Sequence, residues 1–412
     1  MTLPQETAKP GIHVPGSSET AFLATLARAL HMYGTPSHRT EDALVQVAAR
    51  LGVRARFLVT PTSILTSVGE DDQTTLRLER VDAGETNLDK LERLHQVIRD
   101  VFEGTIDAAH ARALVDSIVA ERPLYRPALT ILAFAATGAS GARFFDGGLA
   151  EIAASAVAGL LVGSFMAFAE RRPRLVRLAP AMTGVLAASV AAAAAAQWPL
   201  FSPIVVLASL IVLLPGLTLT VAMNELALGH VVSGSARMTS AIGTFLQLGF
   251  GVAVGTKLGS ILGPASIDAP RHLPEWTIVP ALLGTALTLT VLFRARMRHA
   301  LILLPMTALA YGAARAGTSW SSPEVGAALG SLVLGIAANA VSRWRDIPTA
   351  IPLIPGLLLL VPGSLGFRSL QSLLARDVLG GVESAFTMGL VAVGLVSGLL
   401  VANLVVTPRR LL

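Results

Sequence analysis

The chain has 412 residues, of which 53% are hydrophobic and only 14% are charged. Soluble globular proteins carry about 25% charged residues, so this composition argues against a wholly soluble protein. The absence of cysteine excludes disulfides, thiol catalysis and Cys-type metal sites. The basic clusters lie between apolar runs, which argues against a nucleic-acid-binding protein.

The charges are unevenly distributed along the chain. The first 126 residues hold 14 of the 32 Lys and Arg residues and 17 of the 27 Asp and Glu residues. That segment therefore has a net charge of −3, whereas residues 127–412 have a net charge of +8. A polar, acidic segment followed by an apolar, basic one predicts a water-soluble domain joined to a membrane region.

The polar segment predicts a tail and a small domain. Residues 1–17 are rich in Pro and Gly and lack an apolar core, which predicts a disordered tail rather than a signal peptide. Residues 18–126 predict a cytosolic α+β domain of order ααβββαα. We expect helices at 18–35, from about 40 to 51, at 87–103 and at 107–121, and strands at 53–60, 63–68 and 74–81.

From Pro127 onward the chain predicts an all-α polytopic membrane protein with about ten transmembrane helices. A helix needs about 20 apolar residues to cross the bilayer core. The apolar segments are 127–142, 148–169, 175–196, 200–215, 237–259, 277–293, 300–316, 324–341, 347–362 and 382–406.

The loops predict the orientation of these segments. With a cytoplasmic amino terminus, the cytoplasmic loops are 170–177, 216–236, 294–299, 342–346 and the carboxyl-terminal tail, and four of these five are clearly basic. Such a bias places both termini in the cytoplasm and predicts a multi-pass protein of the inner (plasma) membrane.

A Pro-Gly pair suggests an internal duplication. Leu214-Pro215-Gly216 recurs as Val361-Pro362-Gly363, and each copy is followed by a glycine 18 residues and another 35 residues after its own glycine. We therefore expect two five-helix repeats, at 127–260 and 277–406. If all five helices cross the membrane, an odd number inverts the second repeat, an arrangement found in many secondary transporters.

The same residues carry a family resemblance. The motif LLPGLTLTVAMNELALGHVVSGSAR (213–237) and the stretch LHMYGTPSHRTEDALVQVAARLG (30–52) resemble the threonine/serine exporter family. The resemblance covers nearly the whole chain. It implies export of small hydrophilic amino acids driven by the proton-motive force, with split relatives associated with dicarboxylates such as succinate. The implied partners are the substrate, protons and the lipid bilayer, no cofactor or metal is implied, and a homo-oligomer is left open.

The expected substrate and proton pathway follows the Pro-Gly pairs. The helix start at Gly216 would offer unpaired N–H groups to a carboxylate, and intramembrane carboxylates are functional candidates. Glu225 is expected either to act in transport or simply to pair with Arg237 or His230, and Arg237 is expected either to bind substrate or to anchor its helix. The full set of candidates is Pro215, Gly216, Thr218, Thr220, Asn224, Glu225, Arg237, Pro362 and Gly363.

Two other classes of function compete with an exporter. A membrane-tethered hydrolase would place catalysis in the soluble domain, where His31, His38 and Glu41 belong to a polar cluster around a turn. The same cluster fits a regulatory ligand pocket or a simple capping group. No Ser/His/Asp constellation stands out in the sequence, and a mere anchor would not need ten spans, so we predict a transporter and not an enzyme.

Overall fold

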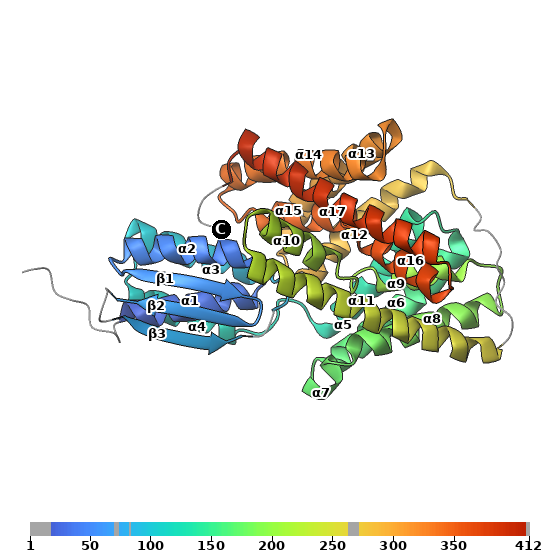
Figure 1. Cartoon of the computed structure of the whole chain (residues 1–412), viewed down its shortest axis with the longest axis horizontal. Helices are drawn as coiled ribbons and strands as arrows, with labels where there is room; N and C mark the ends of the chain where they lie inside the picture. Colours follow the sequence, from blue (N-terminus) through green and yellow to red (C-terminus); the bar gives the residue numbers. More distant parts are fainter. Residues whose placement is uncertain (1–17, 70–73, 82–83, 263–271, 409–412) are drawn as a thin grey trace, which may run out of the picture. The chain divides into compact units, whose positions relative to one another are not determined.

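The structure is a computed structural model that describes residues 18–69, 74–81, 84–262 and 272–408 (Figure 1). The predicted tail at 1–17 lies outside the described residues, as does 263–271, where the two predicted repeats join. The chain is mostly helical and separates into two compact units. The first comprises the described residues up to 86 together with 90–121, and the second comprises 87–89 and the described residues from 122 to 408.

The first unit combines helices with a small sheet. Its helices are α1 (Ser18–Met32), α2 (Ser37–Arg50), most of α3 (Leu88–Glu103) and α4 (Ala108–Ala120). Strands β1 (Ala55–Thr60), β2 (Ser63–Val68) and β3 (Thr75–Arg80) form an antiparallel sheet in the order β1-β2-β3. Fully buried apolar side chains on the helices, such as Phe22, Leu44 and Leu94, form the core.

The second unit consists of helices throughout its described part. They are α5 (Pro127–Phe144), α6 (Leu149–Ala169), α7 (Pro173–Val176), α8 (Ala179–Ala195), α9 (Ser202–Leu210), α10 (Gly216–Ala227), α11 (Val231–Gly259), α12 (Ile278–Leu292), α13 (Ala300–Trp320), α14 (Pro323–Arg345), α15 (Ala350–Leu360), α16 (Gly363–Leu374) and α17 (Val378–Val405). Short 3₁₀ turns flank α11, α12 and α13.

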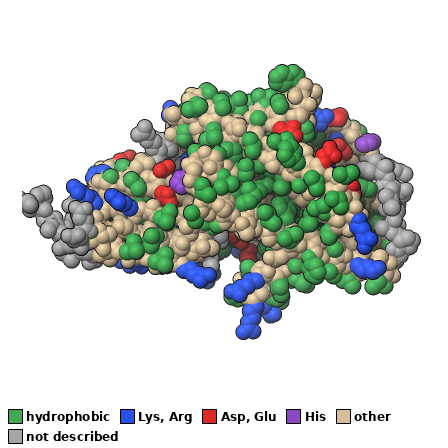
Figure 2. Space-filling model, in the orientation of Figure 1, with side chains coloured by type: hydrophobic (Ala, Val, Ile, Leu, Met, Phe, Trp, Pro, Cys, Tyr) green, Lys and Arg blue, Asp and Glu red, His purple; other side chains and the backbone are tan. Residues whose placement is uncertain are grey.

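The length and composition of these helices identify a multi-pass membrane protein. Among the described residues, seven segments are long and apolar enough to cross a membrane: α6, α11, α12 and α13 with their 3₁₀ turns, α14, α15 with α16, and α17. Helix α8 is apolar but shorter. Figure 2 shows hydrophobic side chains spread across the visible face of this unit, while Lys and Arg side chains gather around α7.

Two segments predicted as loops are helical in the structure. Residues 216–236 form α10 and the start of α11, and residues 363–381 form α16 and the start of α17. Each predicted span that ended at a Pro-Gly pair is therefore a helix interrupted at that pair, with a second, 12-residue helix beyond it. Helix α9 ends at Leu210, five residues before Pro215, and α15 ends at Leu360, two residues before Pro362. In each case the proline, which lacks a backbone donor, and the glycine, which permits a change of direction, stand at the start of the second helix.

The same order of helices occurs twice in the second unit. A helix hairpin, a third helix, an interrupted helix and a long helix make up α5–α11, and the same elements make up α12–α17. In both sets the third helix packs along the long one, α8 on α11 and α14 on α17. The half-helices that follow the two interruptions are both 12 residues long.

Matched glycines make matched contacts in the two sets. A Cβ atom on Gly234 would lie 2.7 Å from Cγ of Leu226, and one on Gly381 would lie 2.6 Å from Cγ of Leu373. Both the glycines and the leucines are 147 residues apart. Likewise Gly251 touches the carbonyl oxygen of Ala181, and Gly398 touches that of Ala328, again at an offset of 147 residues.

Each half-helix packs on the long helix of its own set and also reaches the core of the other set. Phe367 of α16 is fully buried in the core formed by α5, α6, α8, α9 and α11. In return, Leu217 of α10 packs on the core of α13, α14, α15 and α17. Each half-helix therefore contacts both halves of the unit, and the two interruptions lie against each other.

Candidate functional site

The two Pro-Gly interruptions have the same local structure. Pro215 (φ −77°, ψ 36°) precedes α10, and Pro362 (φ −79°, ψ 21°) precedes α16. The first helical hydrogen bonds are donated by Leu219 N to Pro215 O and by Gly366 N to Pro362 O. The N–H of Gly216 donates to Leu214 O at 2.8 Å. The other N–H groups before the first helical bonds have no helical acceptor, so each helix start presents donors and the positive end of its dipole.

The two interruptions touch each other through their backbones. A Cβ atom on Gly216 would lie 3.0 Å from the backbone nitrogen of Gly363 and 2.7 Å from Cγ2 of Val361. In the opposite direction, a Cβ atom on Gly363 would lie 3.3 Å from Cα of Gly216 and 3.1 Å from Cβ of Leu214. Glycine allows two backbone segments to approach so closely, so the repeated Pro-Gly pairs of the sequence mark a physical contact.

A small cavity of about 180 Å³ lies at this contact. Both interruptions line it, through two pairs of residues at the 147-residue offset, and aromatic rings from α5 and α13 complete the wall. The ring centroids of Phe144 and Tyr311 are 5.7 Å apart. The lining residues are Phe144, Phe145, Ile211, Leu214, Tyr311, Leu358, Leu359, Val361, Gly363 and Ser364.

The structure divides the predicted site residues between two places. Pro215, Gly216, Pro362 and Gly363 come together at the cavity, although only Gly363 of these four is among its lining residues. The Thr220 hydroxyl donates to the carbonyl oxygen of Gly216 at 3.0 Å and is buried. Thr218 and Asn224 are partly buried on α10 and do not line the cavity.

Glu225 and Arg237 form an ion pair away from the cavity. Nε of Arg237 donates to both carboxylate oxygens of Glu225, at 3.1 and 3.0 Å. The Glu225 side chain is fully buried and that of Arg237 is 17% exposed. Glu225 lies nine residues beyond Gly216, about 14 Å along the helix axis, so the pair is separate from the cavity. It joins α10 to α11, as the pairing alternative expected.

Two buried charged residues of the second unit were not predicted. Glu151 is 2% exposed, and its carboxylate accepts hydrogen bonds from Gly148 N at 2.9 Å and Phe201 N at 2.8 Å. Arg143 is 5% exposed and donates to the Thr277 hydroxyl at 2.6 Å. The only sequence signal was a Glu at the third position of a helix that begins after Gly148, which is a capping pattern.

The polar cluster of the first unit is bonded within that unit. Nε2 of His31 lies 3.1 Å from the carbonyl oxygen of Pro61, and the Glu41 carboxylate accepts from Val59 N at 2.6 Å. Nζ of Lys90 donates to the Tyr33 hydroxyl at 3.3 Å. These bonds attach the α1–α2 corner to the sheet and to α3, which favours a structural role for the cluster. Burial lowers the pKa of Arg39, and the nearby Asp42 opposes that effect.

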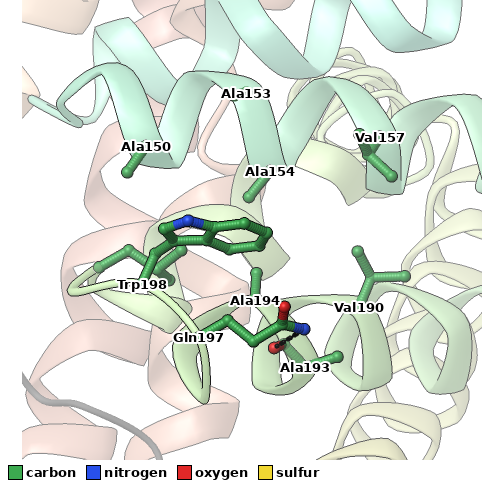
Figure 3. A pocket seen from close by; sticks show the side chains of 10 residues that line it. Ala150, Ala153, Ala154, Val157, Val190, Ala193, Ala194, Gln197 and Trp198 are labelled. Atoms are coloured by element: carbon green, nitrogen blue, oxygen red, sulfur yellow. Dashed lines mark hydrogen bonds between the residues drawn. The ribbon is translucent and has the colours of Figure 1, made fainter.

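Within the described part of the chain, His, Asp and Glu form no group of three or more that could hold a metal ion. A larger cavity of about 460 Å³ lies between α6 and α8. Figure 3 shows the Trp198 ring across its floor, among Ala150, Ala154 and Ala194. Its one amide, on Gln197, already donates to Ala193 O at 3.4 Å. This lining offers little to a hydrophilic solute, so the smaller cavity is the better candidate site.

Comparisons with known proteins agree with this architecture. Residues 21–259 match the family model described as "Putative threonine/serine exporter", and residues 279–405 match the one described as "Threonine/Serine exporter, ThrE". No solved structure matches the chain.

The chain is also similar to fungal proteins named "Pheromone-regulated membrane protein 10". Identity is 28% with the protein of Saccharomyces cerevisiae, over 89% of this chain and 48% of the relative, and 27% with that of Eremothecium gossypii, over 94% and 56%. The chain thus spans about half the length of these relatives. Because the first family model alone covers more than half of its residues, the chain belongs to the threonine/serine exporter family.

Proposed function

We propose that this protein is a secondary exporter of threonine and serine, driven by the proton-motive force, in the inner (plasma) membrane. The observation that carries the proposal is the cavity at which the two Pro-Gly interruptions meet, in a chain of an exporter family. Secondary transporters bind their solutes where discontinuous helices meet near the middle of the bilayer. No enzymatic reaction is part of the proposal.

The proposed architecture is an inverted repeat of two five-span halves. Each interrupted helix, α9 with α10 and α15 with α16, counts as one crossing, which gives ten crossings and places both termini in the cytoplasm. The matched glycine contacts, and the half-helices that each reach the core of the other set, support a duplication. Five crossings per half require the halves to have opposite orientations. The basic loops support the placement of both termini in the cytoplasm.

The cavity suits a small amino acid in size and chemistry. Its volume of about 180 Å³ corresponds to roughly six water molecules and is below the range of about 300–1,000 Å³ typical of drug-sized ligands. The N–H groups at the start of α16 would bind the substrate carboxylate, and Ser364 adds a hydroxyl. Ile211 and Leu358 offer apolar contacts to the methyl group that distinguishes threonine from serine.

A small dicarboxylate such as succinate is the second candidate substrate. None of the ten lining residues is acidic, so the described wall offers no carboxylate to a substrate ammonium group. Aromatic faces are the remaining cation partners there, and cation–π contacts are weaker than ion pairs with a buried carboxylate. Both candidates share the carboxylate that the helix start would bind.

Glu225 is the proposed site of proton coupling. In its charged form it pairs with Arg237 across the α10–α11 hairpin. Both residues belong to the motif at 213–237 that resembles the exporter family. A proton on Glu225 would cancel the negative charge and weaken the pair, which would free α10 to move relative to α11. Because α10 begins at Gly216, such a movement would reach the cavity.

Counterflow in vesicles of the purified protein tests the proposal. We expect exchange of labelled threonine and serine, with succinate measured in parallel. We expect Glu225→Gln and Glu225→Ala to abolish exchange or its pH dependence, while Glu383→Gln, an exposed acid on α17, behaves like the wild type. Vesicles that exchange none of the three solutes would disprove the function. Net transport that survives collapse of the proton gradient would disprove the coupling.

A further inference from the structure

Three arginines contact or directly precede aromatic residues of the cavity wall, and two of them form ion pairs. Arg143 precedes Phe144 in α5 and forms an ion pair with Asp146 at 3.2 Å. Arg315 donates to the Tyr311 hydroxyl at 3.2 Å and pairs with Glu275 at 3.2 Å. Both guanidinium groups therefore already have protein acceptors.

Arg368 differs from these two. Its guanidinium carbon lies 5.6 Å from the ring centroid of Phe145, which is a wall residue of the cavity. Its side chain is exposed, and within the described residues it has neither a hydrogen bond nor an ion pair. The ring contact leaves the five N–H donors of the guanidinium open to an external acceptor.

The position of Arg368 makes this unpaired charge costly. It lies on α16, five residues after Gly363 and therefore about 7.5 Å along the axis from the helix start. Helices α15 and α16 together form one of the apolar segments long enough to cross a membrane. Charged residues within such segments are expensive and usually mark a pathway for an ion or a substrate.

We propose that Arg368 receives the substrate carboxylate at the mouth of the cavity and makes a carboxylate the required feature of every substrate. This inference rests on the proposed export function. The planar guanidinium binds a carboxylate through two parallel hydrogen bonds, and Phe145 holds it beside the cavity when no substrate is present. The start of α16 then binds the same carboxylate deeper in the cavity, since both groups carry positive charge.

The test compares a substrate with its analogue lacking the carboxylate. Threonine counterflow is measured in vesicles for the wild type, Arg368→Gln and Arg368→Lys, with threoninol as a competing amino alcohol. Arg376→Gln is the matched control, because it removes another exposed arginine just beyond the end of α16.

We expect Arg368→Gln to raise the KM for threonine about tenfold or more, since a charge-assisted pair is lost. Inhibition by threoninol should not change, so the preference for threonine over threoninol should shrink. Arg368→Lys, which keeps the charge but loses the planar fork, should lie between the two, and it serves as the test if Arg368→Gln does not reach the membrane.

If the wild type exchanges threonine and Arg368→Gln changes neither the KM nor the preference for threonine over threoninol, the role of Arg368 is overturned and the proposed function is not. An equal loss in Arg376→Gln would also overturn it, because the effect would then be general surface charge. Wild-type vesicles without any exchange would instead remove the proposed function on which this inference rests.

Discussion

At the scale of single residues, Gly216 and Gly363 are the positions where the absence of a side chain decides the structure. Each would place a Cβ atom against the backbone of the other, so an added methyl group must push the two interruptions apart. Thr220, in contrast, uses its hydroxyl within its own helix. Backbone contact, and not a set of polar side chains, therefore distinguishes the centre of the second unit.

Gly216→Ala and Gly363→Ala should each abolish counterflow and lower the free energy of unfolding by about 1–3 kcal/mol, the usual cost of overpacking. Gly243→Ala on α11 is the matched control, because a Cβ atom there would meet no other atom within 4 Å. Thermal unfolding in detergent and threonine exchange measure the two effects. Normal exchange in either variant would show that the contact between the interruptions does not matter for transport.

Sequence patterns predicted some site residues and missed others for physical reasons. The Pro-Gly pairs could be recognised from the local sequence, because both residues alter the backbone conformation in any context. The pairing of Glu225 with Arg237 was one of two expectations, since residues 12 apart on a helix hairpin can meet. Phe144, Phe145 and Tyr311 carry no local signal, because only the folding of α5 against the rest of the unit brings them to the cavity.

At the scale of helices and strands, the periodic segments were the predictable ones. All seven elements of the amino-terminal segment lie within about three residues of the expected bounds, because their alternation and end signals are local. The loop predicted over residues 363–381 was wrong, whereas residues 216–236 were predicted both as a loop and as a half-helix beginning at Gly216, and the structure has the helix. Polar residues on α10 and α16 resemble those of a loop between spans. The contact of each half-helix with the core of the other set is a long-range contact that no local pattern encodes.

The two long-helix contacts solve the same packing problem in opposite ways. In the first set Gly255 of α11 faces Ala188 of α8, with the added Cβ atom 2.9 Å from the alanine Cβ. In the second set Gly335 of α14 faces Ala402 of α17, at 2.6 Å. The positions correspond at an offset of 147 residues. The glycine is therefore on the long helix in the first set and on the third helix in the second set, and the alanine is on the facing helix each time. One small side chain per contact suffices for close packing.

This exchange predicts a rescue. Gly335→Ala should lower the free energy of unfolding by about 1–3 kcal/mol, because two methyl groups would then occupy the place of one. Adding Ala402→Gly should restore most of the loss, because it recreates the glycine–alanine pair on the opposite helices. Thermal unfolding of the three variants in detergent gives the coupling. Additive losses in the double variant would contradict the idea that both sets share one packing solution.

At the scale of the whole molecule, the orientation of the helices is the proposal with the widest consequences. If the halves are inverted, the turns at 146 and 321 face the outside, whereas 174 and 297 face the cytoplasm. All four positions are exposed in the structure. The natural chain has no cysteine, so each single-cysteine variant carries one specific thiol for labelling.

An impermeant maleimide should therefore label Asp146→Cys and Ser321→Cys in intact cells, and Arg174→Cys and Met297→Cys only after the membrane is opened. The reason is that ten crossings return the chain to the cytoplasm after every second helix, counting each interrupted helix as one. The unmodified chain, which cannot react, is the control. Labelling of Met297→Cys from outside would mean that the second half has the same orientation as the first. The two Pro-Gly interruptions would then enter the cavity from the same side of the bilayer, which alternating access by inverted halves does not allow.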